Sequence, residues 1–206
     1  MHHRGKVLGV LALMLLLASG PALTASFDSY ESVMYDAILF DDYNMIDLDL
    51  EKPIESSHAK INVNDAGISV VIRAHNLPPK EAVTLWMAVF NNPAACASEL
   101  CNAADFAEKP DTEPALFYGE GKVTNTSGKA LFFASVGVTD DVYANLGQGL
   151  TNLKDAQIIL FIRGHGRAQS RNLEAQLAGG PNGGCDPEPP HAPCKDYQAV
   201  RFQLDR

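Results

Sequence analysis

Seven short runs of apolar and β-branched residues, separated by connections rich in glycine and proline, constrain the fold of this chain most strongly. Several runs alternate apolar and polar residues, which is the period of a strand with one buried face. One run is apolar at every position except Thr84, as expected of a central strand covered on both faces. The runs span residues 60–64, 67–76, 83–90, 115–124, 129–138, 157–165 and 197–204.

This pattern predicts an all-β fold, an antiparallel β-sandwich of the Ig-like or Greek-key type with short helices in long loops. The tight-turn sequence Asn-Thr-Ser-Gly at 125–128 predicts a hairpin between the two runs beside it. Helical turns are expected within the three longest connections, at residues 98–108, 139–146 and 171–178.

The first 25 residues are expected to be a secretory signal peptide rather than part of the fold. Arg4 and Lys6 precede an apolar run of twelve residues, and small residues then lead to an expected cleavage near Ala25/Ser26. The apolar run is too short to span a bilayer comfortably. We therefore expect a periplasmic or secreted protein without a membrane span.

Residues 26–56 form an acidic segment that we expect to pack on or flank a single β-sandwich domain at 57–206. Aromatic residues are interleaved with its acids, which argues against a disordered tail. Loss of residues 1–25 would remove Arg4 and Lys6 and no acid, leaving 14 basic against 25 acidic residues, a net charge of −11. Such a charge disfavours binding to nucleic acids or to anionic membrane surfaces.

Four cysteines lie beyond the expected signal peptide, and in an exported chain an even number predicts disulfides. Three pairings are conceivable. We expect the local one, Cys96–Cys101 with Cys185–Cys194, because each pair lies inside one connection. The spacings, C-x4-C and C-x8-C, differ from the paired C-x2-C of a zinc ribbon.

Two tetrads that place an Arg and a His two positions apart form the one constellation that resembles a site. They are Ile72-Arg73-Ala74-His75 and Ile162-Arg163-Gly164-His165. Residues two apart in a strand share a face. If successive strands alternate in direction, both tetrads finish at the same end of the sandwich.

The connection after residue 165 starts at that end, and four of the six arginines beyond residue 25 fall in the tetrads and this connection. Arg groups match carboxylate and phosphate ligands, so one hypothesis is a site for an anionic small molecule or partner. Its residues would be Arg73, His75, Arg163, His165 and Arg167.

The alternative is a copper or zinc site, in a metal-binding protein or metalloenzyme, formed by His75, His165 and His191. A third interpretation is that these side chains are outward-facing charges paired with the protein's own acids.

Catalysis receives little support from the sequence. There is no Gly-x-Ser-x-Gly nucleophile motif, and the cysteines are expected to be oxidised. Trp86, the single Trp, shares strand phase with Ala88 and Phe90 and is expected to be a core residue. The favoured interpretation is a binding protein without a cofactor rather than an enzyme.

From Val83 onward, the chain resembles a family of exported bacterial proteins of unassigned function. The matching segments are TLWMAVFNNPAAC, CNAADF, LFYGEGKV, GLTNLKDAQIILFIRGHG and Gly183-Gly184-Cys185. The GLTN segment leading into an apolar strand also resembles the CHRD domain, the β-sandwich repeat of chordin. The second resemblance implies an extracellular sandwich that binds partners. Neither resemblance supplies a catalytic residue.

Overall fold

The computed structural model describes residues 27–39, 45–143, 146–185 and 194–206 of the chain. Within these ranges, two short α-helices, α1 (Ala103–Glu108) and α2 (Leu173–Ala178), accompany eight strands. Two 3-10 turns, Pro93–Ala95 and Pro110–Thr112, flank α1. The strands are β1 (Asp28–Leu39), β2 (Met45–Asn64), β3 (Gly67–Ala74), β4 (Glu81–Phe90), β5 (Pro114–Val123), β6 (Ala130–Gly137), β7 (Gln157–Arg167) and β8 (Lys195–Gln203).

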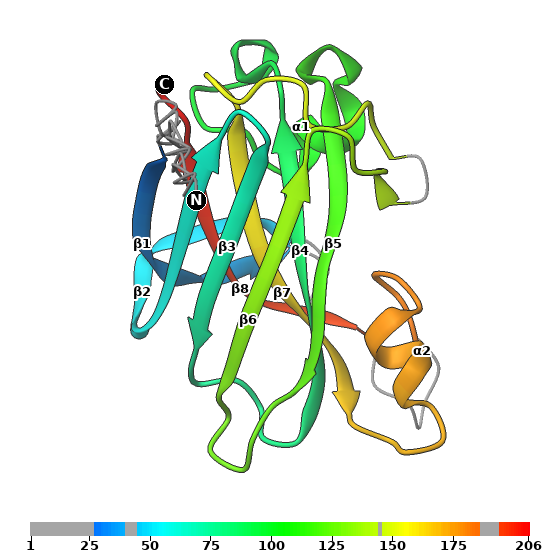
Figure 1. Cartoon of the computed structure of the whole chain (residues 1–206). Coiled ribbons are helices and arrows are strands. Elements are labelled where there is room, and N and C mark those ends of the chain that lie inside the picture. The colour runs from blue at the N-terminus through cyan, green and yellow to red at the C-terminus, as the bar shows by residue number, and fades with distance from the viewer. Residues whose placement is uncertain (1–26, 40–44, 144–145, 186–193) are drawn as a thin grey trace, which may run out of the picture.

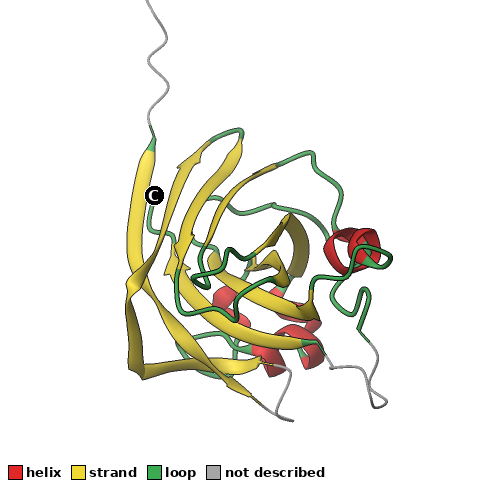
Figure 2. Cartoon of the chain, turned by 90° about the horizontal axis from the view of Figure 1, so that it is seen from below, coloured by secondary structure: helices red, strands yellow, loops and turns green. Residues whose placement is uncertain are grey.

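All eight strands belong to one antiparallel sheet, in the order β5-β4-β7-β8-β1-β2-β3-β6 (Figure 1). The sheet curls strongly around its interior (Figure 2), so that its two edge strands, β5 and β6, lie side by side (Figure 1). There the Glu120 carboxylate on β5 accepts a hydrogen bond of 2.9 Å from the backbone N–H of Phe133 on β6. The all-β antiparallel prediction is confirmed. A sandwich of two sheets is not, because all eight strands belong to one continuous sheet. The hairpin predicted around residues 125–128 is wrong, because β5 pairs with β4 and β6 pairs with β3 rather than with each other.

The continuity comes from β1 and β2, which are long and bent. Their pairing shifts register at three places, the first between Val33 and Met34. Bulges of this kind bend a strand and increase its twist. On its other side, β1 pairs with β8 only through Tyr35 and Asp36. The acidic segment 26–56, expected to pack on or flank the domain, thus supplies β1 and the first part of β2.

The main hydrophobic core fills the inside of the curled sheet. Ile72, Phe132 and Ile162 are among its fully buried members. Because successive side chains of a strand point to opposite faces, the inward direction of the two isoleucines turns Arg73 and Arg163 outward. In each tetrad the Arg side chain therefore lies on the outer face of the sheet, away from the main core.

A second hydrophobic cluster lies on the outer face of β4 and β7. Trp86 is fully buried there, with the rings of Tyr118 and Tyr143 edge-on at 5.4 and 5.0 Å. Every residue of β4 is buried, and the strand lies between β5 and β7, so its prediction as a central strand is confirmed. Trp86 is therefore a buried core residue, and it belongs to this outer cluster rather than to the main core.

Both expected disulfides are present, Cys96–Cys101 and Cys185–Cys194. The helices α1 and α2 lie within two of the three connections where helical turns are expected. In the third, residues 139–142 are not helical, and Asp140 accepts a hydrogen bond from the backbone N–H of Gly137 at the end of β6. Tyr143 in the same connection has 3-10 geometry, and its carbonyl accepts a hydrogen bond of 2.9 Å from the backbone N–H of Leu146.

The expected signal peptide, residues 1–25, lies outside the described residues. Within the described ranges, no helix has the length and apolar character that a membrane crossing requires.

Replacing Trp86 with alanine is expected to lower the free energy of unfolding by roughly 3–5 kcal/mol, because the substitution removes a large buried ring and leaves a cavity. Urea unfolding followed by circular dichroism measures the change. Phe133→Ala is the control, since Phe133 is 56% exposed and its truncation should change stability little. Equal unfolding midpoints for the Trp86→Ala variant and the unmodified protein would contradict the core role.

Candidate functional site

The two tetrads occupy different environments although their sequences are similar. Arg73 on β3 is exposed and His75, just after the strand, is half-buried. Arg163 and His165 on β7 are only 5% and 2% exposed. The difference arises because the chain after β7 folds back over the outer face of its own sheet. The second tetrad is therefore an internal site.

Residues 168–185, which include α2, form this covering layer and are called the cover segment. The side-chain amide of Gln176, fully buried in α2, donates to the backbone carbonyls of His165 at 2.8 Å and Arg167 at 3.1 Å. The hydroxyl of Tyr118 on β5 donates to the carbonyl of Leu177 at 2.6 Å. Through these bonds the cover segment is held against β5 and β7.

Both ring nitrogens of His165 are hydrogen-bonded. Nδ1 lies 2.8 Å from the carbonyl oxygen of Gly183, which can only accept, so Nδ1 carries the proton. Nε2 then accepts from the hydroxyl of Thr84 at 2.7 Å, and that hydroxyl oxygen accepts from the indole N–H of Trp86 at 2.7 Å. Burial lowers the pKa of His165, and the charge of Arg163 adds to this effect, so the ring is held neutral.

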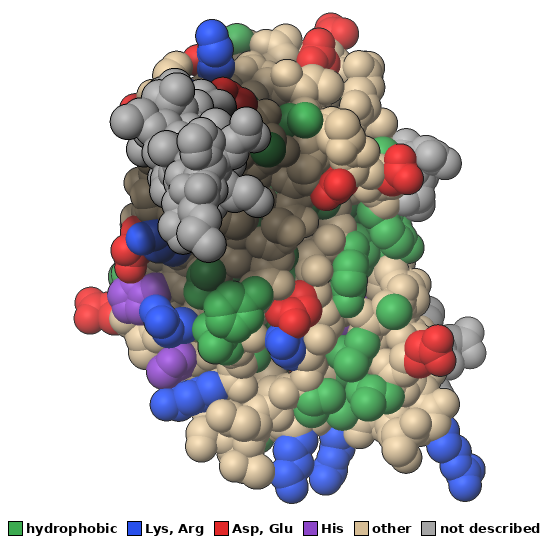
Figure 3. Space-filling model, in the orientation of Figure 1, with side chains coloured by type: hydrophobic (Ala, Val, Ile, Leu, Met, Phe, Trp, Pro, Cys, Tyr) green, Lys and Arg blue, Asp and Glu red, His purple; other side chains and the backbone are tan. Residues whose placement is uncertain are grey.

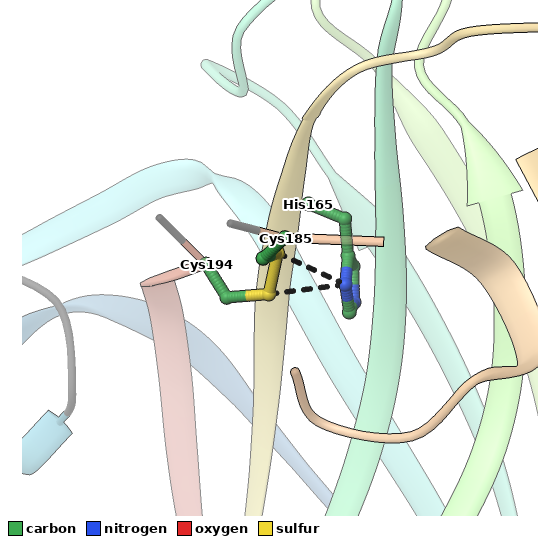
Figure 4. Close-up of side chains that lie close together, drawn as sticks. All are labelled: His165, Cys185 and Cys194. Atoms are coloured by element: carbon green, nitrogen blue, oxygen red, sulfur yellow. Dashed lines mark hydrogen bonds between the residues drawn. A yellow bond between two sulfur atoms is a disulfide. The ribbon is translucent and has the colours of Figure 1, made fainter. Parts of the chain in front are cut away.

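The Cys185–Cys194 disulfide lies directly against this imidazole (Figure 4). The Sγ atoms of Cys194 and Cys185 are 3.3 and 3.6 Å from His165 Nδ1. Within the described part of the chain, this is the one place where three His, Cys, Asp or Glu side chains bring ligand atoms within 4.8 Å of one another. The sequence did not suggest that the disulfide and the second tetrad would meet.

Arg163 lies beside His165 and the disulfide, and its guanidinium is bonded to groups of the protein itself. Its guanidinium forms an ion pair of 2.8 Å with Asp196 on β8 and donates to the carbonyl of Pro181 at 2.6 Å. A third bond reaches the side-chain oxygen of Asn182 at 3.1 Å. Through these bonds Arg163 joins the cover segment to β7 and β8. Removing one partner of the buried ion pair would leave the other charge buried without compensation, which is strongly destabilising.

Gly164, between Arg163 and His165, faces the inside of the sheet. A Cβ atom there would collide with Glu81 Oε1 and with the ring of Tyr197. The Tyr197 hydroxyl donates to the Glu81 carboxylate at 2.6 Å. Burial raises the pKa of Glu81 and, together with the nearby carboxylate, that of Tyr197. The close packing of this pair accounts for glycine at a position where the first tetrad has an alanine.

The outer face of β2, β3 and β6 has no such cover. Strand pairing places His58, Arg73 and Leu131 opposite one another, and Lys60 and Phe133 lie two residues further along on the same face. These five residues form the outer patch. Its three basic side chains are exposed, and Leu131 and Phe133 are 42% and 56% exposed. Figure 3 shows Lys, Arg and His side chains gathered near hydrophobic ones on the lower part of this face.

The structure thus separates the predicted anion-binding residues. Arg163 and His165 lie together under the cover segment, while Arg73 belongs to the outer patch and Arg167 is exposed at the end of β7. The backbone of His75 is bonded to the side chains of Ser57 and Gln198. No group of three ligand side chains within the described residues includes His75.

His191, the third member of the alternative metal site, lies outside the described residues. The copper or zinc site that uses His75 and His165 with it therefore stays a prediction.

Several contributing residues were missed by the sequence reasoning. The strand that the sequence predicts begins at residue 60, so the pattern places His58 in a connection and gives no sign of its pairing with Arg73. Thr84 had a usable signal, because it is the one hydroxyl residue in an otherwise apolar run. Gln176 had none, since a glutamine in a short helical segment gives no sign of burial.

A small cavity of about 150 Å³ lies on the outer face between β4, β7 and α1. Its volume is below the 300–1,000 Å³ typical of ligand pockets. It is lined almost entirely by apolar side chains, with Asp196 as the exception: Ala88, Phe90, Ala103, Phe106, Leu116, Ile159 and Phe161. The cavity is therefore a small, mostly apolar space within the second hydrophobic cluster, and it offers no polar group beyond Asp196 to orient a ligand.

No family model, curated protein or solved structure matches this chain. The resemblances to exported bacterial proteins and to the CHRD domain therefore stay predictions, and the geometry alone supports the functional argument.

The neutral state of His165 predicts that the protein loses stability as the pH falls below about 6.5, the ordinary pKa of histidine. Below this pH, His165 binds a proton in the unfolded chain but not in the folded chain. The contribution of His165 to the free energy of unfolding therefore falls by at most about 1.4 kcal/mol per pH unit. Urea unfolding at several values between about pH 7.5 and about pH 5, on both sides of the ordinary pKa of histidine, tests this. The stability difference between the unmodified protein and His165→Gln should shrink as the pH falls.

The raised pKa of Glu81 works in the opposite direction at lower pH, but it is common to both proteins and cancels in the difference. Parallel profiles for the unmodified protein and His165→Gln would mean that His165 takes up its proton in the folded state.

Proposed function

We propose that this chain is an exported interaction protein, periplasmic or secreted, which binds an acidic protein partner through the outer patch. The observation that carries the proposal is the register of β2, β3 and β6, which places His58, Lys60 and Arg73 beside Leu131 and Phe133 on an uncovered sheet face. The two disulfides support export, because such bonds persist in oxidising compartments.

The basic side chains of the patch are available for a partner. Within the described residues, neither Lys60 nor Arg73 belongs to an ion pair. This argues against the interpretation that the exposed charge of the first tetrad is neutralised by the protein's own acids. In a chain of net charge −9, such a local cluster attracts acidic groups while the rest of the surface repels them.

The shape and composition of the patch favour a protein rather than a small molecule. Small ligands bind in concave pockets, whereas an exposed apolar group edged by charged residues is typical of protein interfaces. Leu131 and Phe133 would supply buried contact area, and Arg73 is a residue type enriched at such interfaces. An open polar groove of about 360 Å³, lined in part by Asn62, Ser69 and Ser135, continues the same face toward the β2–β3 turn.

An acidic peptide in which Glu alternates with Phe, labelled with a fluorophore, is the probe for this proposal. We expect its fluorescence anisotropy to rise with the oxidised protein. Arg73→Glu should weaken binding roughly tenfold or more, because it replaces an attraction by a like-charge repulsion. Phe133→Ser should also weaken it, since the apolar contact is lost while the backbone bond to Glu120 is retained.

Lys154→Glu is the matched control, with the same change in net charge. Lys154 lines a groove with Asp65, near the end of β3 opposite to Arg73. Equal weakening by Arg73→Glu and Lys154→Glu would mean that only net charge matters and would refute the outer patch as the site. Binding of heparin but not of the acidic peptide would refute the protein partner in favour of a sulfated polysaccharide.

A further inference from the structure

We infer that Cys185, Cys194 and His165 form a Zn²⁺ site when the disulfide between the two cysteines is reduced. This inference is independent of the outer patch and of the histidine-only metal site. The bridge and the metal complex are alternative states of the same three side chains, and the oxidised state excludes the ion.

The distances within the group match those required by zinc. With Zn–N at about 2.0 Å, Zn–S at about 2.3 Å and tetrahedral angles, a nitrogen and a sulfur ligand lie about 3.5 Å apart. His165 Nδ1 lies 3.3 Å from Cys194 Sγ and 3.6 Å from Cys185 Sγ. The two sulfur atoms must separate, to about 3.8 Å, when their bond is broken. Rotation of the cysteine side chains can supply this movement. The carbonyl oxygen of Gly183, 2.8 Å from Nδ1, must also move away from the position that the ion takes.

The surroundings of His165 provide the support that a metal-bound imidazole requires. Coordination through Nδ1 needs the proton on Nε2, where it would be donated to the hydroxyl oxygen of Thr84. That oxygen already accepts from Trp86 and has a second lone pair. The carbonyl of Gly183 loses its bond to Nδ1 in exchange. The ring thus changes tautomer without gaining or losing a proton.

Charge and burial are also compatible with a bound cation. Two thiolates balance the charge of Zn²⁺, and the nearby Arg163 is already paired with Asp196. His165 and Cys194 are 2% and 4% exposed, whereas Cys185 is only partly buried and offers the route of access. Three protein ligands leave the fourth position of zinc for a water molecule.

The chemistry balances with a phosphine or a thiol as the reductant. A phosphine gives two electrons to the S–S bond and becomes the phosphine oxide, taking its oxygen from water, while the two protons of that water yield two thiols. Binding of Zn²⁺ then releases two protons, one from each cysteine. With a thiol reductant, two reductant thiols become one disulfide and the same two cysteine thiols are formed.

The test uses the full chain in oxidised form and after reduction with a phosphine under argon. Co²⁺, which reports thiolate and tetrahedral coordination through its absorption spectrum, is titrated first, and Zn²⁺ then displaces it. We expect one ion per chain in the reduced protein and none in the oxidised protein. In a Cys96→Ser/Cys101→Ser background, His165→Gln should weaken binding roughly tenfold or more, whereas His75→Gln should not.

Alkylation of the unmodified chain keeps the inference testable if a variant fails to fold. After reduction, Zn²⁺ should slow the reaction of Cys185 and Cys194 with iodoacetamide roughly tenfold and leave Cys96 and Cys101 unaffected, as mapped by mass spectrometry. Equal protection of all four cysteines would overturn the inference, and so would unprotected Cys185 and Cys194. If His75→Gln lowered the affinity for the metal ion as much as His165→Gln does, this ligand set would be overturned.

Discussion

The burial of β4 on both faces is the constraint on which the rest of the structure depends. One face of this strand packs into the curled sheet, and the other would expose Trp86 and Phe90 to water if nothing covered it. The covering layer comes from the connections, because the sheet has no second sheet to supply it. Two of the covering connections carry one disulfide each, Cys96–Cys101 near α1 and Cys185–Cys194 after α2, and the connection between β6 and β7 adds the ring of Tyr143. A local disulfide limits the freedom of the unfolded loop, which is how short irregular segments can hold a hydrophobic surface.

Because connections cover one part of the outer face and leave another part open, the two similar tetrads have different environments. The cover segment follows β7 directly, so the outward side chains of that strand became internal and acquired fixed partners: Asp196 for Arg163, and Thr84 and Gly183 for His165. The strand β3 lies on the other side of the curled sheet, next to the edge strand β6, where the outer face is open. Arg73 therefore remained a surface charge. Sequence similarity between two strands does not carry over to their function when only one of them is covered.

The open face carries the proposed function, and the covered site carries the separate inference about zinc. The outer patch is a rigid surface, since its side chains project from three paired strands rather than from loops. The covered site is where we infer a second, reduced state, because its disulfide contacts an imidazole already oriented by Thr84. A change in that disulfide would act on the cover segment over β4 and β7 and would leave the register of the outer patch intact.

Local patterns were enough to predict the antiparallel strands, the buried β4 and both disulfide pairs, because alternation, apolar runs and short loop closures are properties of neighbouring residues. The expectation that the two tetrads finish at the same end also holds, because β3 and β7 run in the same direction through the antiparallel sheet. The continuity of the sheet through the bent β1 and β2 was not predictable, since it depends on bulges that no residue type marks. Nor was the meeting of His165 with Cys185 and Cys194, or of His58 with Arg73. The sequence by itself determined which residues alternate, pair locally and turn outward, whereas only the tertiary structure decided which outward side chains are covered, because burial depends on segments distant in the chain.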